Sequence, residues 1–594
     1  MDVLSANATR RDAKPYLARF KVAKPGKSQT LDVQAERARP QRSGVNLGDL
    51  YAPSRAIADS PQFVQQNKVE RASTAKQQPL HVALVCLRAP EALDDATLEG
   101  VAITLSQLVK LDTRIVLVLD LNVYEGGASV VLQKIAIAEQ AERVQQALRR
   151  HSAGASRLVT SSLECEQASG DSTDGDVSLA LPMLVMEPLR RGIVLIIPCL
   201  AYTPSGQLQI APAGDVMAAL TKGLYGLHDE EILESHSQQT NYNTSLDRII
   251  VLDPAGGIPS KDRGDYAHVF VNLEQEFDGI YSELSEYSTA THKNNATARI
   301  YDQHKSNLSM LNRCLAMLPS ASSALIISPH EVARSSQASA QEPTIGTGTR
   351  RQKNTLIHNL LTNKPMVSSS LPTARLPSTT NSSVDPAMTA ANTATLVKKG
   401  MPLTIIPAAD RTFGWQLPTS GRTPLLLESD PRVDFARLTL LIEDSFRREL
   451  NIQHYLDRIS GRIAGLIVAG NYEGAAILTW EQPPGTTDPA RLVPYLDKFA
   501  VLQSSQGSSG VADILFQAMV RTAFPAGVCW RSRQDNPVNK WYFERAAGSW
   551  QIPGTQWTLF WTGEGVVENE EKWEDYVSVC RSVLPSWADG KRPD

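Results

Sequence analysis

Short apolar runs alternate with amphipathic stretches from His81 to Ile327, and this alternation constrains the fold more than any other feature. The apolar runs are rich in Val, Ile and Leu, as expected for strands that are buried on both faces. The amphipathic stretches Asp94–Val109 and Val130–Arg150 are typical of helices. Strands that alternate with helices predict an α/β unit, with a parallel sheet covered on both sides. The expected strands are His81–Cys86, Arg114–Leu119, Ile193–Ile197, Arg248–Leu252, His268–Val271 and Ala324–Ile327.

Polar segments surround this α/β region, which we place at residues 80–332. Residues 26–79 are rich in Gln, Arg, Ser and Ala, and their composition favours a flexible arm after an N-terminal helix within residues 1–25. Residues 333–394 are dominated by Ser, Thr, Ala, Gln and Pro, as in an insert or a linker. A less polar island at Thr355–Pro365 is expected to dock on the first domain.

Regular structure resumes at residue 395 in a different order, and we expect an α+β domain over residues 395–570 with a tail at 571–594. A hairpin, a central strand and a following helix come in succession, which is unlike the preceding alternation. The expected elements are a helix at Ala436–Arg448, a hairpin of Leu466–Val468 with Gly474–Trp480, a strand at Leu496–Leu502 and a helix at Val511–Phe524.

Charge and cysteine content exclude several classes of function. The formal net charge of −4 and the pI of about 6.3 give no electrostatic reason to expect nucleic acid as a partner. The longest apolar runs, such as Gly192–Ala201, are shorter than the roughly 20 residues that cross a bilayer, so no membrane span is expected. The six cysteines are scattered without a CxxC pair, which indicates neither a zinc site nor a disulfide framework.

The segment Cys529–Phe543, CWRSRQDNPVNKWYF, carries the clearest chemistry. Arg531 and Arg533 occupy alternate positions, so on a strand both guanidinium groups face the same side. Each guanidinium can bind a carboxylate through two parallel hydrogen bonds, and the pair therefore suits a small dicarboxylate. A solvated strand with surface ion pairs is the alternative.

Together with the runs Pro494–Phe499 and Trp557–Trp561, this segment resembles the acetyltransferase domain of N-acetylglutamate synthases, especially the fungal ones. The resemblance extends from Asn7 to Trp561 outside two polar inserts, an acidic one at Cys165–Ser178 and the one at 333–394. It implies a three-layer amino-acid kinase-like domain followed by a GNAT-type acetyltransferase domain. It also implies transfer of the acetyl group of acetyl-CoA to the α-amine of L-glutamate, the first step of arginine and ornithine biosynthesis.

The resemblance assigns the catalytic roles to Tyr495 and Asn536. In this fold the amine attacks the thioester directly, so the enzyme must orient the amine, polarise the carbonyl and protonate the leaving thiolate. The Tyr495 hydroxyl would donate a proton or order a water, and Asn536 would orient the amine or the pantetheine. The alternatives are a tyrosine that only packs and a simple Asn-Pro turn. The sequence offers no clear general base, and the reaction needs no metal.

Four basic residues are assigned to the two carboxylates of glutamate: Arg448, Lys498, Arg531 and Arg533. Arg448 belongs to Ser445–Leu450, which resembles the basic helix end that faces substrate in the family. Its neighbour Arg447 could serve instead, and an ordinary solvated helix end remains an alternative reading.

The cofactor site is expected at the turn Gln506–Ala512, between the central strand and the next helix. Backbone N–H groups at a helix N-terminus bind phosphate well. The family pattern has a further glycine near Ser509 and basic residues near Gln503, and their absence here predicts weaker binding of CoA. An ordinary Gly/Ser turn is the alternative. The residues assigned to acetyl-CoA are Phe499, Ala500, Gln506, Gly507, Gly510 and Ala512.

The kinase-like domain is expected to be non-catalytic. Its first strand runs into Leu87–Glu91, where Pro90 and the lack of a glycine pair make a poor phosphate-binding turn. Regulated relatives bind the inhibitor L-arginine in this domain, with a mobile N-terminal helix that Asn7–Phe20 resembles. Pro15 departs from that helix, and a helix used only for packing is the alternative.

Two other functions remain open. A regulatory scaffold for acetylglutamate kinase would fit the altered CoA turn. The intact set of predicted site residues argues against it, namely Tyr495, Lys498, Arg531, Arg533 and Asn536. An active acetylglutamate kinase is disfavoured because glycine-rich phosphate turns are missing. The resemblance further implies a homo-oligomer, a complex with acetylglutamate kinase, and a location in the mitochondrial matrix, for which the basic N-terminus is a weak signal.

Overall fold

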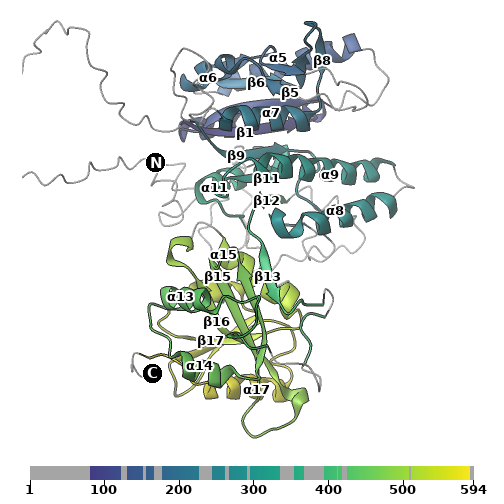
Figure 1. Ribbon diagram of the computed structural model, residues 1–594. Helices are drawn as coiled ribbons and strands as arrows, with labels where there is room; N and C mark the ends of the chain where they lie inside the picture. The colour runs from purple at the N-terminus through teal and green to yellow at the C-terminus, as the bar shows by residue number, and fades with distance from the viewer. Residues whose placement is uncertain are drawn as a thin grey trace, which may run out of the picture.

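The computed structural model consists of two units stacked along one axis (Figure 1). The described residues are 80–121, 130–151, 155–165, 177–226, 244–260, 267–290, 295–334, 354–366, 393–410, 413–417, 425–506 and 510–588. The N-terminal helix expected within residues 1–25 and the arm expected at 26–79 lie outside these residues.

The first unit is built on an eight-stranded sheet of order β10-β12-β11-β9-β1-β2-β6-β3. All neighbouring strands are parallel except β11 and β12. The predicted α/β class is therefore confirmed, and all six expected strands are present. The strands are β1 Leu80–Arg88, β2 Arg114–Asp120, β3 Ser156–Leu158, β6 Val194–Pro198, β9 Thr244–Leu252, β10 Phe270–Asn272, β11 Ser323–Ile327 and β12 Ala394–Lys398.

Helices cover both faces of this sheet and complete three layers. Alternate residues of β1 separate into two apolar clusters, with Leu84 in one and Val85 in the other, because successive side chains of a strand point to opposite faces. One cluster takes in α6 Pro182–Arg190, α7 Ala213–Gly226, α8 Leu273–Ala290 and α9 Asn295–Ala316. The other takes in α4 Asp95–Lys110, α5 Val130–His151, α10 Pro329–Arg334 and α11 Thr355–Thr362. A smaller sheet contains β4 Leu163–Cys165, β5 Val177–Leu179, β7 Leu200–Tyr202 and β8 Leu208–Ile210.

The second unit is built on a seven-stranded sheet of order β13-β14-β15-β16-β17-β19-β18. Neighbouring strands are antiparallel except β16 and β17. The predicted hairpin is β14 with β15, and the predicted central strand is β16. The strands are β13 Leu403–Ile406, β14 Ile463–Ala469, β15 Gly474–Glu481, β16 Val493–Val501, β17 Cys529–Arg533, β18 Gly548–Gln551 and β19 Trp557–Trp561.

Helices lie on both faces of the second sheet as well. On one face are α13 Phe435–Phe446, α14 Ile452–Ile459 and α17 Glu570–Ser582. On the other face are α15 Val511–Ala518, which continues as a π-helical turn at Met519–Ala523, and α16 Asn539–Arg545. Helix α17 lies where the sequence predicted a tail at 571–594, and that prediction was wrong for this helix. Its residues Tyr576, Val579 and Cys580 are buried against the sheet.

The two units meet through β12 and α15. Strand β12 was expected to open the second domain at residue 395, but it lies between β10 and β11 of the first sheet, where Leu396 and Val397 pack into its two apolar clusters. From α15 of the second unit, Ile514 packs into the first unit, and Gln517 Nε2 donates to Glu276 Oε1 at 3.0 Å. The first unit therefore contacts the helix that is expected to bind the cofactor.

Candidate functional site

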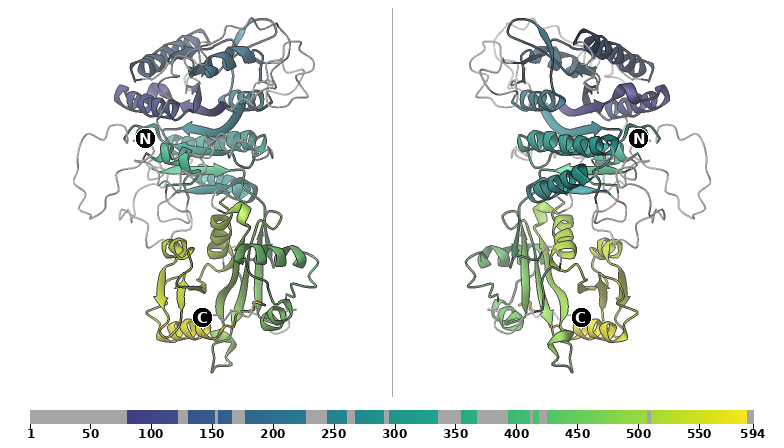
Figure 2. Two further views of the ribbon diagram at one scale, coloured as in Figure 1. Left: turned by 90° about the vertical axis from the view of Figure 1, so that its left-hand side faces the viewer. Right: turned by 90° about the vertical axis from the view of Figure 1, so that its right-hand side faces the viewer.

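Strands β16 and β17 are neighbours in the second sheet, but in the described residues they pair only through Tyr495 and Cys529. Beyond this pair the two strands diverge, and Figure 2 shows the green and yellow parts of the sheet separating toward the first unit. Backbone groups of β16 on the side of the divergence are not used by β17, and such groups need another partner. The divergence therefore leaves a place where a ligand can complete the sheet.

A β-bulge in β16 brings two charged side chains to one face. The register with β15 shifts so that Leu478 pairs with Leu496 and Ile477 with Lys498, which leaves Asp497 as the extra residue. Neighbouring residues on a regular strand point to opposite faces. Here the carboxylate of Asp497 accepts hydrogen bonds from Lys498 Nζ at 3.0 Å and from the Tyr455 hydroxyl at 2.9 Å, both on the side of α14.

The cluster around Asp497 carries an excess positive charge. Burial acts to raise the pKa of Asp497, but Lys498 and Arg458 outweigh burial and lower that pKa to about 2. The buried Glu481 pairs with Arg458 at 3.4 Å and with Arg462 at 3.0 Å. Three cations against two carboxylates leave one positive charge uncompensated within this cluster. Burial also lowers the pKa of Lys498, so an anionic ligand at this site would be stabilising.

Residues 583–588 after α17 form a segment that we call the C-terminal strap, and it crosses this same face of the sheet. Asn451 N donates to Ser586 O at 3.0 Å, and Ala588 N donates to Glu449 O at 2.9 Å, which fixes the strap to the start of α14. The Trp587 ring lies 5.1 Å from Arg448 Cζ and 5.7 Å from Lys498 Nζ. Cations favour such positions near an indole ring. Trp587 thus brings together two residues predicted to bind carboxylates.

The two arginines of β17 face the same side, as predicted, but their guanidinium groups have different partners. Arg531 donates to the backbone oxygens of Cys580, at 2.6 Å, and Val583, at the C-terminal end of α17. Its guanidinium also stacks 4.2 Å from the Trp557 ring. Arg533 is half-exposed and pairs with Asp535 at 3.1 Å. Binding of a dicarboxylate by both arginines remains a prediction, since Arg531 already caps a helix.

Tyr495 and Asn536 have different surroundings. Tyr495 is 3% exposed and packs in the apolar cluster with Tyr576 of α17. Burial raises the pKa of Tyr495 well above its ordinary value, so the hydroxyl stays protonated and can act only as a neutral donor or acceptor. Asn536 Nδ2 donates to Ser532 Oγ at 2.9 Å, and its Oδ1 accepts from Val538 N at 3.0 Å. Its amide is therefore used within the turn before α16.

The residues assigned to acetyl-CoA lie on β16 and at the start of α15, except Gly507, which lies outside the described residues. Phe499 packs its ring 5.8 Å from that of Trp541, and Ala500 is buried on the opposite face. Gln506 Nε2 donates to Val501 O at 3.1 Å. Gly510 is the N-cap of α15, with a φ of 76°, and Ala512 is in the first turn. A glycine N-cap supplies no side chain to the first-turn amides, which are left for an anion.

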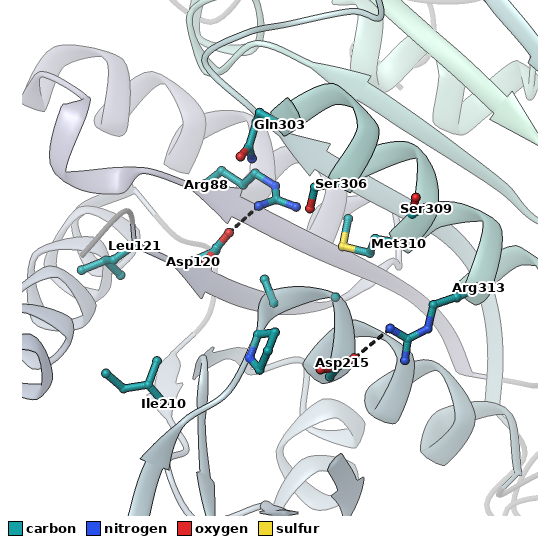
Figure 3. Close-up of a pocket in the computed structure, with 13 residues that line it drawn as sticks. Arg88, Asp120, Leu121, Ile210, Asp215, Gln303, Ser306, Ser309, Met310 and Arg313 are labelled. Carbon is teal, nitrogen blue, oxygen red and sulfur yellow. Dashed lines mark hydrogen bonds and ion pairs between the residues drawn. The ribbon is translucent and has the colours of Figure 1, made fainter. Parts of the chain in front are cut away.

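A cavity of about 590 Å³ in the first unit lies at the carboxyl ends of β1 and β2 (Figure 3). Its charged groups are paired with one another, since Arg88 donates to Asp120 at 2.6 Å and Arg313 to Asp215 at 2.7 Å. After Arg88 the chain passes through Ala89, in a left-handed conformation, into a short 3₁₀ helix that starts at Pro90. This turn has no glycine pair, in agreement with the poor phosphate-binding turn read from the sequence.

The described part of the chain contains no cluster of three or more His, Cys, Asp or Glu side chains that could hold a metal ion. None of the described helices is both long enough and apolar enough to cross a membrane.

Comparisons with known proteins show similarity to acetyltransferases. Residues 425–583 match the family described as the N-acetyltransferase domain of N-acetylglutamate synthase. Two curated relatives are named mitochondrial amino-acid acetyltransferase. The one from Aspergillus oryzae is 44% identical over 99% of this chain and 89% of its own length. The one from Penicillium rubens is 42% identical over 100% of this chain and 83% of its own length.

Among solved structures, the N-acetylglutamate synthase from Neisseria gonorrhoeae complexed with coenzyme A and N-acetyl-glutamate is similar over 82% of this chain and 96% of that chain. The identity is 14% and the TM-score 0.41.

Proposed function

Since the chain belongs to the family of mitochondrial amino-acid acetyltransferases, we propose that it transfers the acetyl group of acetyl-CoA to the α-amine of L-glutamate. The products are N-acetylglutamate and CoA, and the reaction is the first step of arginine and ornithine biosynthesis. The observation that carries the proposal is the divergence of β16 and β17 beyond Tyr495 and Cys529, next to a cluster with one excess positive charge.

In this proposal acetyl-CoA lies in the divergence, with its thioester carbonyl near the backbone N–H of Phe499, since the N–H of Ala500 faces β15 in the register of the two strands. Donors fixed in place stabilise the oxyanion that forms when the amine attacks. The new C–N bond forms as the C–S bond breaks, the amine gives up a proton to water, and the thiolate takes one from Tyr495 or a water it orders. A neutral Tyr495 suits this role, and Asn536, whose amide lies in the turn after β17, is assigned to orient the amine or the pantetheine.

The carboxylates of glutamate are bound by the cations on the α14 side of the sheet. Lys498 and Arg448 converge on the Trp587 ring and are placed to bind one carboxylate. Arg533, half-exposed at the end of β17, is assigned to the other. Arg531 contributes from the same strand face, while two of its donors hold the end of α17.

L-Arginine is the proposed feedback inhibitor, acting through the first unit, which has no catalytic role in this account. Support comes from the contact of α15 with the first unit through Ile514 and through Gln517 and Glu276. A change in the first unit can thus reach the helix that binds the cofactor. The proposed location is the mitochondrial matrix, in line with the names of the relatives.

We further propose a homo-oligomer and a complex with acetylglutamate kinase. The start of α5 supports an interface, because Val130, Val131, Leu132 and Ile135 are all about half exposed or more. Exposed apolar patches of this kind often mark contacts with other chains. Light scattering after size exclusion tests the oligomer, and Val131→Glu should reduce the mass if this face is the contact.

The function is tested by following CoA release from acetyl-CoA with L-glutamate, L-aspartate, L-glutamine and L-ornithine as acceptors, with and without L-arginine. We expect the highest kcat/KM with L-glutamate, and inhibition by L-arginine. If a folded protein binds acetyl-CoA but releases no CoA, the regulatory scaffold becomes the better reading, and effects on an acetylglutamate kinase should be measured next.

A further inference from the structure

Lys398, the last residue of β12 in the first unit, points at the start of α15 in the second unit. Lys398 is 4% exposed. Its Nζ lies close to Gly510, since a Cβ added to that glycine would be 4.0 Å from the Nζ. Among the described residues its Nζ has no hydrogen bond or ion pair, although this atom is not one of the fully buried polar atoms that lack a partner. A cation on a side chain this buried loses much of its hydration and gains no partner in return, which disfavours the charged form.

The electrostatic surroundings make the ammonium group more costly still. The N-terminus of a helix carries a partial positive charge, and Gly510 supplies no side-chain cap there. Burial lowers the pKa of Lys398 to about 8, with Arg248 of β9 and Lys364 acting in the same direction and Asp513 of α15 opposing them. Asp513 is itself paired with Arg545 at 2.8 Å. Positive potential from both units therefore converges on one point.

We propose that Lys398 binds a phosphate group of acetyl-CoA together with the first-turn amides of α15. An anion between the ammonium group and the helix N-terminus would remove the repulsion between them, and lysine binds phosphate as a point charge. The inference rests on the proposed use of acetyl-CoA. Relatives in the family have basic residues near Gln503, and this chain lacks them. In this inference Lys398 supplies a basic group for the phosphates from another part of the chain.

This assignment makes the cofactor site a joint product of both units. Lys398 lies outside residues 425–583, which match the acetyltransferase family, and it is part of the sheet of the first unit. Any change in the first unit that moves β12 relative to α15 would then alter the affinity for acetyl-CoA directly.

The test compares Lys398→Met, which keeps the length of the side chain but removes its charge, with Lys399→Met at the neighbouring, more exposed lysine. Isothermal titration gives the Kd of CoA for the full-length proteins, and turnover with L-glutamate gives the KM of acetyl-CoA and of acetyl-pantetheine, which lacks phosphates. Lys398→Met should weaken CoA binding by about tenfold or more, as for a lost hydrogen bond to a charged group. The KM of acetyl-pantetheine should not change, and Lys399→Met should behave like the wild type.

Thermal unfolding without ligand separates binding from folding. Because Lys398→Met removes a buried, unpaired charge, the variant should unfold at the same temperature as the wild type or higher. Dephospho-CoA then identifies the group: if it shows the same loss in Lys398→Met as CoA, the pyrophosphate is the partner, and if it shows none, the 3′-phosphate is.

Two results would overturn the inference: an unchanged affinity for CoA in Lys398→Met, or an equal loss with acetyl-pantetheine. In either case a wild type that binds CoA leaves the proposed function standing. A wild type that does not bind CoA would instead remove the proposed function itself.

Discussion

Tyr495 and Cys529 form the one described residue pair that joins β16 to β17, and the central strand of the second unit opens directly beyond it. The bulge at Asp497 follows two residues after Tyr495 and directs the side chain of Lys498 toward α14. The sheet therefore opens, and its charged side chains change face, within the short stretch from Tyr495 to Lys498. This short stretch positions the catalytic tyrosine, the carboxylate-binding cation and the cofactor-binding edge of the proposed enzyme.

The first prediction concerns Lys498. Lys498→Met should raise the KM of L-glutamate by about tenfold or more, since a hydrogen bond to a charged group contributes about 1.5–3 kcal/mol. The KM of acetyl-CoA should stay unchanged, because the proposed position of the thioester is along the β16 edge. Arg437→Met, at an exposed cation on α13, is the matched control. Equal glutamate KM values for both variants would remove Lys498 from the site.

The second prediction concerns the Tyr495 hydroxyl. Tyr495→Phe should lower kcat by about a hundredfold, the lower range for loss of a general acid, with little change in either KM. Tyr576→Phe is the control, because Tyr576 is buried in the same apolar cluster. The pKa of Tyr495 is raised, so the wild type should keep its activity up to about pH 10 as far as this group is concerned. A Tyr495→Phe variant with full kcat would reduce the residue to a packing role.

The third prediction concerns the strap. Trp587→Ala should raise the KM of L-glutamate several-fold, since a cation near an indole ring gains about 0.5–2 kcal/mol and Arg448 and Lys498 both lose that contact. Trp587→Phe should recover part of the affinity. Leu584→Ala removes an exposed side chain from the same strap and should be neutral. If Leu584→Ala and Trp587→Ala behave alike, the strap acts only through its general packing.

The fourth prediction links Asp497 to stability. The pKa of Asp497 is lowered from 3.8 to about 2 in the folded protein. Its carboxylate therefore binds a proton more weakly in the folded state than in the unfolded state. This pKa difference contributes about 2 kcal/mol to the free energy of unfolding. The contribution is present above pH 4 and is lost as the pH falls through 2. Asp497→Asn should lower the free energy of unfolding at pH 7, and the difference from wild type should narrow toward pH 2. Urea unfolding at several pH values measures this; a difference that does not vary with pH would contradict it.

The sequence predicted the order of elements well, because the signals that specify them are local. Runs of Val, Ile and Leu identified six of the eight strands in the large sheet of the first unit, and the hairpin and central strand of the second unit were found by the same reasoning. The sequence also predicted that regular structure resumes at residue 395, yet it could not reveal which sheet this strand joins. That choice depends on the space between β10 and β11, which only the folded chain creates.

The site was predicted less completely, because its decisive features depend on register and on distant contacts. On a regular strand the side chains of Asp497 and Lys498 would point to opposite faces. The residues Leu496–Phe499 contain no sequence signal for the bulge that puts both side chains on one face. Arg531 has the spacing of a ligand-binding arginine, but the end of α17 takes two of its donors. Trp587 and Lys398 lie far along the chain from the motifs that identified the site. Their residue types alone therefore did not indicate that they belong to it.

The most direct test of the central claim is hydrogen exchange of the full-length protein with and without acetyl-CoA. Acetyl-CoA at the divergence of β16 and β17 should slow exchange at Phe499 and in the first turn of α15, whereas L-glutamate alone should leave these amides unchanged. Protection confined to the first unit, around the cavity at Arg88 and Asp120, would contradict the account, because the acetyl donor would then bind away from the strands that we propose to hold it.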